Sequence, residues 1–176
     1  MQKIDKTRSL TPGDDRSRAW KAISLYTGAS LSDLVIFDIE TTGLSANVSS
    51  LYLIGALWYD TPKKEIKMCQ WFADDYNSEK NILKEFLEYI KQFDVIIHYN
   101  GSTFDIPYIN KKCKRHAVNP SALNEMKNLD IYHALRKYAA LLKLPDKKLK
   151  SFERYVGLNR DDTFNGGELI EVYAEY

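Results

Sequence analysis

The chain has 176 residues, enough for one ordinary domain and a short appendage, since a typical domain holds roughly 100–150 residues. Its composition, 44% hydrophobic and 28% charged with a net charge of +1, excludes a disordered or fibrous protein. The longest apolar run, from Leu51 to Tyr59, is much shorter than the about twenty residues of a membrane-spanning helix, so no membrane partner is expected.

Residues 1–30 are predicted to form an N-terminal arm that is loose or weakly docked, because they are polar and interrupted by Pro12 and Gly13. Within this arm, the segment 20–26 is expected to pack down through Trp20, Ile23 and Tyr26. No apolar stretch follows the first residues, so no signal peptide is expected. The two cysteines share no short-spacing motif, which is typical of reduced thiols in a cytoplasmic protein.

Five segments after this arm are predicted to be strands. Residues 33–38 and 94–99 contain continuous apolar runs, which are typical of strands buried on both faces. Residues 51–59 and 65–72 are joined by a five-residue turn, so these two strands should pair antiparallel. A short strand near residues 128–130 completes the set.

Apolar residues at helical spacing predict helices over 78–93, 105–116, 132–142, 149–156 and 167–176. The order of elements predicts a mixed five-stranded α/β sheet, with three antiparallel strands, then parallel strands, and helices on both faces. This is the order of a ribonuclease-H-like sheet over residues 31–176, although order alone fits several α/β folds.

The first segment with chemical meaning is Phe37-Asp38-Ile39-Glu40-Thr41-Thr42-Gly43-Leu44. Asp38 and Glu40 are two residues apart at the end of a predicted strand, so both carboxylates lie on the same face. Carboxylates this close repel each other unless a cation lies between them, and a divalent cation with oxygen ligands meets that need. An isolated Asp-x-Glu is more often a strand end that enters solvent, but the apolar run before it and the Thr-Thr-Gly after it favour a site.

The second such segment, residues 97–108, also follows a predicted buried strand and opens a helix. Asp105 stands in the strand-to-helix loop. If the two buried strands run parallel, Asp105 and the pair of Asp38 and Glu40 open on the same edge of the sheet, where α/β proteins bind ligands. Taken alone, Asp105 is more simply explained as a helix N-cap.

Together, the two segments resemble the DEDD family of 3′–5′ exonucleases. The first matches the family's Asp-x-Glu-Thr-Thr-Gly-Leu motif, and the second matches its Asn-x3-Phe-Asp motif from Asn100 to Asp105. Within that family the chain is most similar to the YprB-like ribonuclease-H-like domain, with further matches at Leu53-Ile54-Gly55 and His98-Tyr99-Asn100-Gly101. The resemblance extends from about Leu34 to the last residue.

This resemblance implies a metal-dependent 3′–5′ exonuclease that acts on single-stranded ends of DNA or RNA, with two Mg²⁺ or Mn²⁺ ions held by four acidic residues. It implies that Asp38 bridges both ions, that Glu40 holds the ion that activates water, and that Asp105 holds the second ion, directly or through water. It also implies five residues that contact the substrate: Thr41, Gly43, Leu44, Asn100 and Phe104.

The fourth acid of the family pattern is missing at its expected spacing. The third family motif reads Tyr-x3-Asp or His-x4-Asp in most members, and no tyrosine or histidine of this chain satisfies it. Asp161 and Asp162 lie in a string that mimics part of that motif, but the string precedes a Gly-Gly helix, where the family has a different motif. The chain also stops inside a predicted helix, so we expect a C-terminal truncation, weak metal binding and little nuclease activity.

Three further features have both a structural and a functional interpretation. His98 is expected to be a satisfied core histidine rather than a catalyst. Asp130 is expected to cap the next helix rather than to help a metal site. Residues 107–160 carry thirteen Lys or Arg against four Asp or Glu, a net charge of +9 that leaves −8 for the rest of the chain. Such a block suits a polyanion, although composition alone favours solvated helix faces.

Two classes of function therefore remain open. Asp38, Glu40 and Asp105 favour a metal-dependent exonuclease. The missing fourth carboxylate favours a non-catalytic ribonuclease-H-like module that binds nucleic acid or a protein partner.

Overall fold

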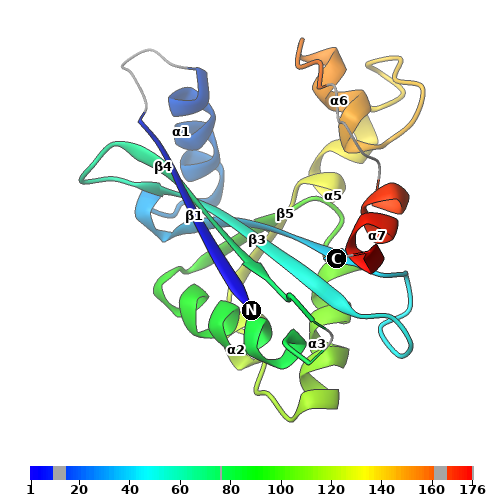
Figure 1. Ribbon diagram of the computed structural model, residues 1–176. Helices are drawn as coiled ribbons and strands as arrows, with labels where there is room; N and C mark the ends of the chain where they lie inside the picture. Colours follow the sequence, from blue (N-terminus) through cyan, green and yellow to red (C-terminus); the bar gives the residue numbers. More distant parts are fainter. Residues whose placement is uncertain (10–14, 76, 161–165, 176) are drawn as a thin grey trace.

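The computed structural model describes residues 1–9, 15–75, 77–160 and 166–175. Its strands are β1 (Gln2–Ser9), β2 (Leu34–Thr41), β3 (Leu51–Asp60), β4 (Glu65–Phe72), β5 (Val95–His98) and β6 (Lys127–Asp130). They form one sheet in the order β1-β4-β3-β2-β5-β6 (Figure 1). The pairs from β1 to β2 are antiparallel, and β5 pairs in parallel with both β2 and β6. The predicted mixed sheet is confirmed, with six strands instead of five.

The additional strand, β1, comes from residues that we expected to form a loose arm. Its backbone pairs with β4 from Gln2 opposite Phe72 to Ser9 opposite Glu65. The prediction was wrong here because strand pairing uses backbone groups, which composition does not report. The charged side chains of β1 suit its position, since charge on an edge strand discourages pairing with another sheet.

Helices cover both faces of the sheet (Figure 1). One face packs against α2 (Glu79–Tyr89), α3 (Asp105–His116) and α4 (Ser121–Asn124), and the other against α1 (Asp15–Thr27) and α5 (Ile131–Leu135). The chain continues into α6 (Leu149–Tyr155) and α7 (Gly166–Glu175). No helix in the described ranges has both the length and the apolar character needed to cross a membrane.

The helix expected over residues 132–142 is much shorter in the structure. α5 ends at Leu135, and a single 3-10 turn over Arg136–Tyr138 follows it. Of the apolar residues in this segment, Ala139 is buried, while Tyr138 and Leu141 are exposed. The segment therefore lacks the continuous apolar face that stabilises a longer helix.

The larger core lies between the sheet and α2. On this face Phe37 stacks on Phe86 of α2 with ring centroids 5.7 Å apart, and Trp71 meets Phe86 edge-on at 5.6 Å. A smaller core on the other face contains Trp20, which is 4% exposed. Trp20 and Ile23 thus pack as expected, whereas Tyr26 is 72% exposed.

Candidate functional site

The first two candidate acids lie inside β2, which continues to Thr41 instead of ending at Asp38. Phe37 and Ile39 are buried in the larger core, and Asp38 and Glu40 alternate with them. Both carboxylates therefore lie on the opposite face of the sheet, as the spacing predicted. Asp38 retains solvent-exposed surface although protein atoms crowd its carboxyl, and Glu40 is half-buried.

Asp105 comes from a different part of the chain and reaches Asp38. It is the first residue of α3 and is only 5% exposed. Its carboxyl is in hydrogen-bond contact with that of Asp38. Burial, followed by the negative charge of Asp38, raises the pKa of Asp105 from 3.8 to about 7. The structure thus brings together the two acids that the sequence placed on separate segments.

The pKa values of the other two carboxyls are also raised. Burial against the surrounding protein raises the pKa of Asp38, and its hydrogen bond with Asp105 offsets only part of this effect. Burial and then the charge of Asp38 raise the pKa of Glu40. Asp38 therefore lies at the centre of the three acids, with Asp105 in contact and Glu40 interacting through charge.

The contact between Asp38 and Asp105 fits a divalent cation. Like charges in contact favour protonation, and a cation that displaces the proton would remove their repulsion. Mg²⁺ is commonly bound by one or two carboxylates together with water and substrate phosphates. Within the described ranges, however, no group of three or more His, Cys, Asp or Glu is arranged to hold a metal ion. Asp161 and Asp162 lie outside the described residues.

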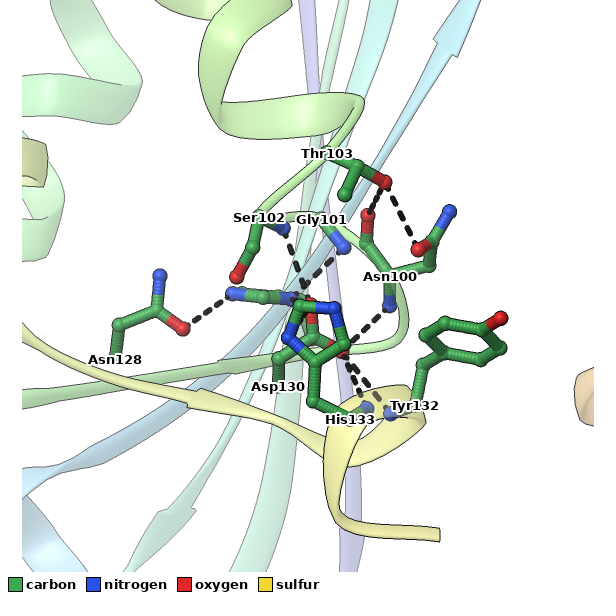
Figure 2. A network of polar contacts seen from close by, with 9 residues as sticks. Asn100, Gly101, Ser102, Thr103, Asn128, Asp130, Tyr132 and His133 are labelled. Atoms are coloured by element: carbon green, nitrogen blue, oxygen red, sulfur yellow. Dashed lines mark hydrogen bonds and ion pairs between the residues drawn. The ribbon is translucent and has the colours of Figure 1, made fainter. Parts of the chain in front are cut away.

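A hub of hydrogen bonds at Asp130 holds the loop that leads to Asp105 (Figure 2). Asp130 accepts the backbone N–H of Asn100 on Oδ1 at 2.9 Å and that of Ser102 on Oδ2 at 3.3 Å. Its Oδ1 also caps α5 by accepting the N–H of Tyr132 at 3.0 Å and of His133 at 3.4 Å. The expected helix cap is confirmed, and the same carboxylate also fixes the loop between β5 and α3.

These contacts determine the charge state of Asp130. Burial raises its pKa, but the N–H of Asn100 and the hydrogen bonds from Ser102 outweigh this effect and hold the pKa below its usual value. Asp130 is therefore an ionised, buried N–H acceptor. It does not join Asp38 and Asp105 in a metal-holding group of three among the described residues.

His98 fixes the same loop from the other side. It is 2% exposed, and its Nδ1 accepts the backbone N–H of Gly101 at 2.9 Å. The hydrogen-bond pattern therefore assigns the proton to Nε2, which donates to Oδ1 of Asn128 at 2.7 Å. Burial lowers the pKa of His98, which keeps the ring neutral. The expectation of a satisfied core histidine is confirmed.

The predicted substrate-contacting residues fall into two groups. The side chains of Asn100 and Thr41 form hydrogen bonds within their own loops. Asn100 Oδ1 accepts a hydrogen bond from the Thr103 hydroxyl at 2.8 Å, and the Thr41 hydroxyl donates to the carbonyl of Gly43 at 3.0 Å. Leu44, in contrast, is 88% exposed, as an apolar wedge against a ligand requires.

The remaining two candidates, Gly43 and Phe104, are packed closely against neighbouring side chains. A Cβ at Gly43 would lie 2.5 Å from Ser49 Oγ, so this glycine allows the loop to close on itself. Phe104 is half-buried next to Tyr108, with ring centroids 5.5 Å apart.

A buried ion-pair network, missed from the sequence, supports the loop of residues 42–50. Glu79 is 3% exposed and Lys112 is fully buried; their charged atoms are 2.9 Å apart. Glu79 also accepts the N–H of Leu51 at 2.6 Å and contacts His116 at 2.6 Å, while Lys112 donates to the carbonyl of Ser49. The sequence could have indicated this network, because Lys112 and His116 share a helical face with Tyr108 and Ile109, which are buried.

An aromatic stack places α7 beside Glu40. A register shift pairs Glu40 with Leu53 and Thr41 with Leu51, which leaves Tyr52 as an extra residue. Bulges of this kind turn a side chain out of its regular alternation. Tyr52 stacks on Tyr173 of α7, with ring centroids 4.3 Å apart. Burial, then the charge of Glu40, raises the pKa of Tyr52 to about 12.

Comparisons with known proteins agree with this fold. A family model described as the RNase_H superfamily matches residues 35–176. The DNA polymerase of Thermococcus kodakarensis is 36% identical over an alignment of 98 positions, which covers 47% of this chain and 6% of the polymerase.

Solved structures show the same fold at lower identity. The family B DNA polymerase from Pyrobaculum calidifontis superposes with a TM-score of 0.62 and 16% identity, over 80% of this chain and 21% of that chain. E. coli exonuclease I in complex with a dT13 oligonucleotide superposes with a TM-score of 0.54 and 17% identity, over 80% of this chain and 39% of that chain. The chain thus corresponds to less than half of each of these proteins. Because the family model covers most of the sequence, the chain belongs to the RNase_H superfamily, and its fold is of the DEDD 3′–5′ exonuclease type.

Proposed function

We propose that the chain is a metal-dependent 3′–5′ exonuclease domain, of the YprB-like kind, that hydrolyses phosphodiester bonds at single-stranded nucleic-acid ends. The observation that carries this proposal is the contact between Asp38 and Asp105, two acids with raised pKa values from separate segments. A like-charge contact reduces the stability of the fold, so its presence favours a functional role.

The residues around this contact suit phosphodiester hydrolysis. Asp38 and Asp105 would hold a Mg²⁺ or Mn²⁺ ion, and Glu40 lies on the same face of the sheet. When bound, such an ion stabilises charge on a phosphate and lowers the pKa of a bound water. Arg160, which pairs with Glu153 at 3.0 Å, is also near enough for its charge to lower the pKa of Asp38.

The substrate class is supported by the relatives and by the loop geometry. One structural neighbour is exonuclease I with a bound oligonucleotide, and a sequence relative is a DNA polymerase. The exposed Leu44 offers an apolar contact for a terminal base, and a single-stranded end exposes such a base. DNA and RNA ends share the phosphodiester group that this site would act on.

One observation favours the alternative, a non-catalytic module that binds nucleic acid or a protein. The described residues hold no group of three or more potential metal ligands. A site with two carboxylates in contact binds Mg²⁺ weakly without further ligands. We therefore expect slow hydrolysis, and Mn²⁺ is the better ion for detecting it.

The test is the shortening of a 5′-labelled single strand by an excess of the protein, with Mn²⁺ and with EDTA. The proposal predicts a slow, Mn²⁺-dependent ladder of shorter products that Asp38→Asn and Asp105→Asn abolish. Asp94→Asn, which removes an exposed carboxylate just before β5, is the matched control and should leave the ladder unchanged. Binding of the strand without any ladder would contradict the exonuclease and support the binding module.

A further inference from the structure

We propose that the recess between loop 42–50 and the outer face of α3 binds the part of a single strand that lies upstream of its 3′-terminal nucleotide. This inference rests on the proposed function, because it assumes that the terminal nucleotide lies near Asp38. It assigns a separate surface to the rest of the strand, which the motifs do not mark.

The recess has a volume of about 490 Å³ and is lined by Ala46, Asn47, Lys111, Lys114 and Arg115. All three basic side chains are exposed, and none makes an ion pair with a described residue. This lining contains no acidic residue. Three such cations gathered in a concave surface attract a polyanion more strongly than the same charges spread over a convex helix.

A stripe of residues on α3 extends from Phe104, which immediately precedes Asp105, to the recess. Phe104, Pro107, Lys111 and Lys114 follow each other at spacings of three or four residues, which places them in one stripe. At 1.5 Å per residue, Arg115 lies about 15 Å along the helix from Asp105. A stacked strand carries a phosphate every 3.4 Å or so, so the recess is about four nucleotides from the terminal one.

The opposite wall of the recess is held in place by the buried network described above. Lys112 projects inward from the same helix and donates to the carbonyl of Ser49, and its ion pair with Glu79 continues to the N–H of Leu51. The loop carries Leu44 and Val48 on its outside, 88% and 84% exposed. A strand in the recess would therefore meet cations on one wall and apolar side chains close to the other, the combination typical of single-strand binding.

The first test compares strand binding with and without the three cations. One variant carries Lys111→Gln, Lys114→Gln and Arg115→Gln, and the control carries Lys6→Gln, Lys64→Gln and Lys84→Gln, which remove the same charge from exposed positions elsewhere. Binding of fluorescein-labelled dT12 and dT3 is followed by anisotropy in EDTA over a range of salt concentrations. Each phosphate contact to a single strand contributes about 0.7 to the slope of log affinity against log salt.

The recess variant should bind dT12 severalfold more weakly than the control, with a salt slope about 2 smaller in magnitude. Its binding of dT3, which is too short to reach the recess from the terminal site, should match the control. Equal losses of dT12 binding in both variants, or equal losses for dT3 and dT12 in the recess variant, would overturn the proposal.

The second test locates the strand directly. The two native cysteines are buried, so Asn47→Cys introduces a single accessible thiol for a photo-crosslinker, and Lys84→Cys on α2 is the control. We expect crosslinks from position 47 at about the fourth nucleotide from the 3′ end. Crosslinking no stronger than from position 84, or only at the terminal nucleotide, would overturn the proposal. Neither test requires hydrolysis. Crosslinking at the expected position by a protein without nuclease activity would therefore support the strand-binding recess and contradict the proposed exonuclease activity.

Discussion

Replacing Asp105 with asparagine should stabilise the metal-free protein at pH 8. Burial of Asp105, and then the charge of Asp38, raise the pKa of Asp105 from 3.8 to about 7. Each pKa unit corresponds to 1.36 kcal/mol or so, which sets an upper bound of about 4 kcal/mol on the stability lost when Asp105 ionises. Asp38 and Asp105 titrate together, so this cost belongs to the pair.

The direction of the pH dependence follows from proton binding. Between pH 3.8 and about 7 the folded site retains a proton that the unfolded chain releases. The contribution of the pair to stability therefore falls as pH rises through this window and is constant above it. The asparagine side chain cannot ionise, so the Asp105→Asn variant should lack most of that loss.

Urea unfolding in EDTA at pH 5 and pH 8 measures the effect. The stability of Asp105→Asn relative to the wild type should increase by up to about 3 kcal/mol between these two pH values. Asp94→Asn, a control with an exposed carboxylate, should show no such change. Added Mn²⁺ should stabilise the wild type at pH 8 and not Asp105→Asn. Equal destabilisation of the variant at both pH values would contradict a raised pKa at Asp105.

Three further predictions concern the supports of the site, each measured by urea unfolding at pH 7. Asp130→Ala removes the acceptor of four N–H groups and should lower the free energy of unfolding by about 2–4 kcal/mol. Asp130→Asn retains one acceptor oxygen and should therefore lower the free energy of unfolding by less. Gly101→Ala places a Cβ 2.7 Å from His98 Cγ and should cost about 1–3 kcal/mol; an unchanged midpoint would contradict the tight contact. Lys112→Met leaves Glu79 buried without this partner and should cost about 3–5 kcal/mol, part of which Glu79→Gln in the same chain should restore.

Much of the fold follows from local patterns that the sequence displays directly. Apolar runs and helical spacing predicted β2, β5, α2 and α3, because burial on one or both faces requires those periods. The meeting of Asp38 and Asp105 was also predictable. Asp38 lies in the second half of β2 and Asp105 comes after β5, and parallel neighbours present their carboxyl ends at one edge of a sheet.

The remaining features depend on contacts between distant segments. β1 pairs through its backbone, so its charged composition indicated an arm instead of a strand. Asp130 was predicted as a cap from its local position, but its bonds to Asn100 and Ser102 depend on the parallel pairing of β5 and β6. Lys112 lies in a run of basic residues that resembles a solvated face, and only the position of Glu79 on α2 explains its burial.

The central claim is that the face carrying Asp38 and Asp105 hydrolyses nucleic acid from free 3′ ends. The most direct measurement compares a 5′-labelled linear single strand with a covalently closed circle of the same sequence, each incubated with Mn²⁺ and an excess of the protein. With the wild type we predict progressive shortening of the linear strand and an intact circle, and with Asp38→Asn we predict that both strands remain intact. A nicked circle, or a linear strand that remains full length with the wild type, would contradict this claim.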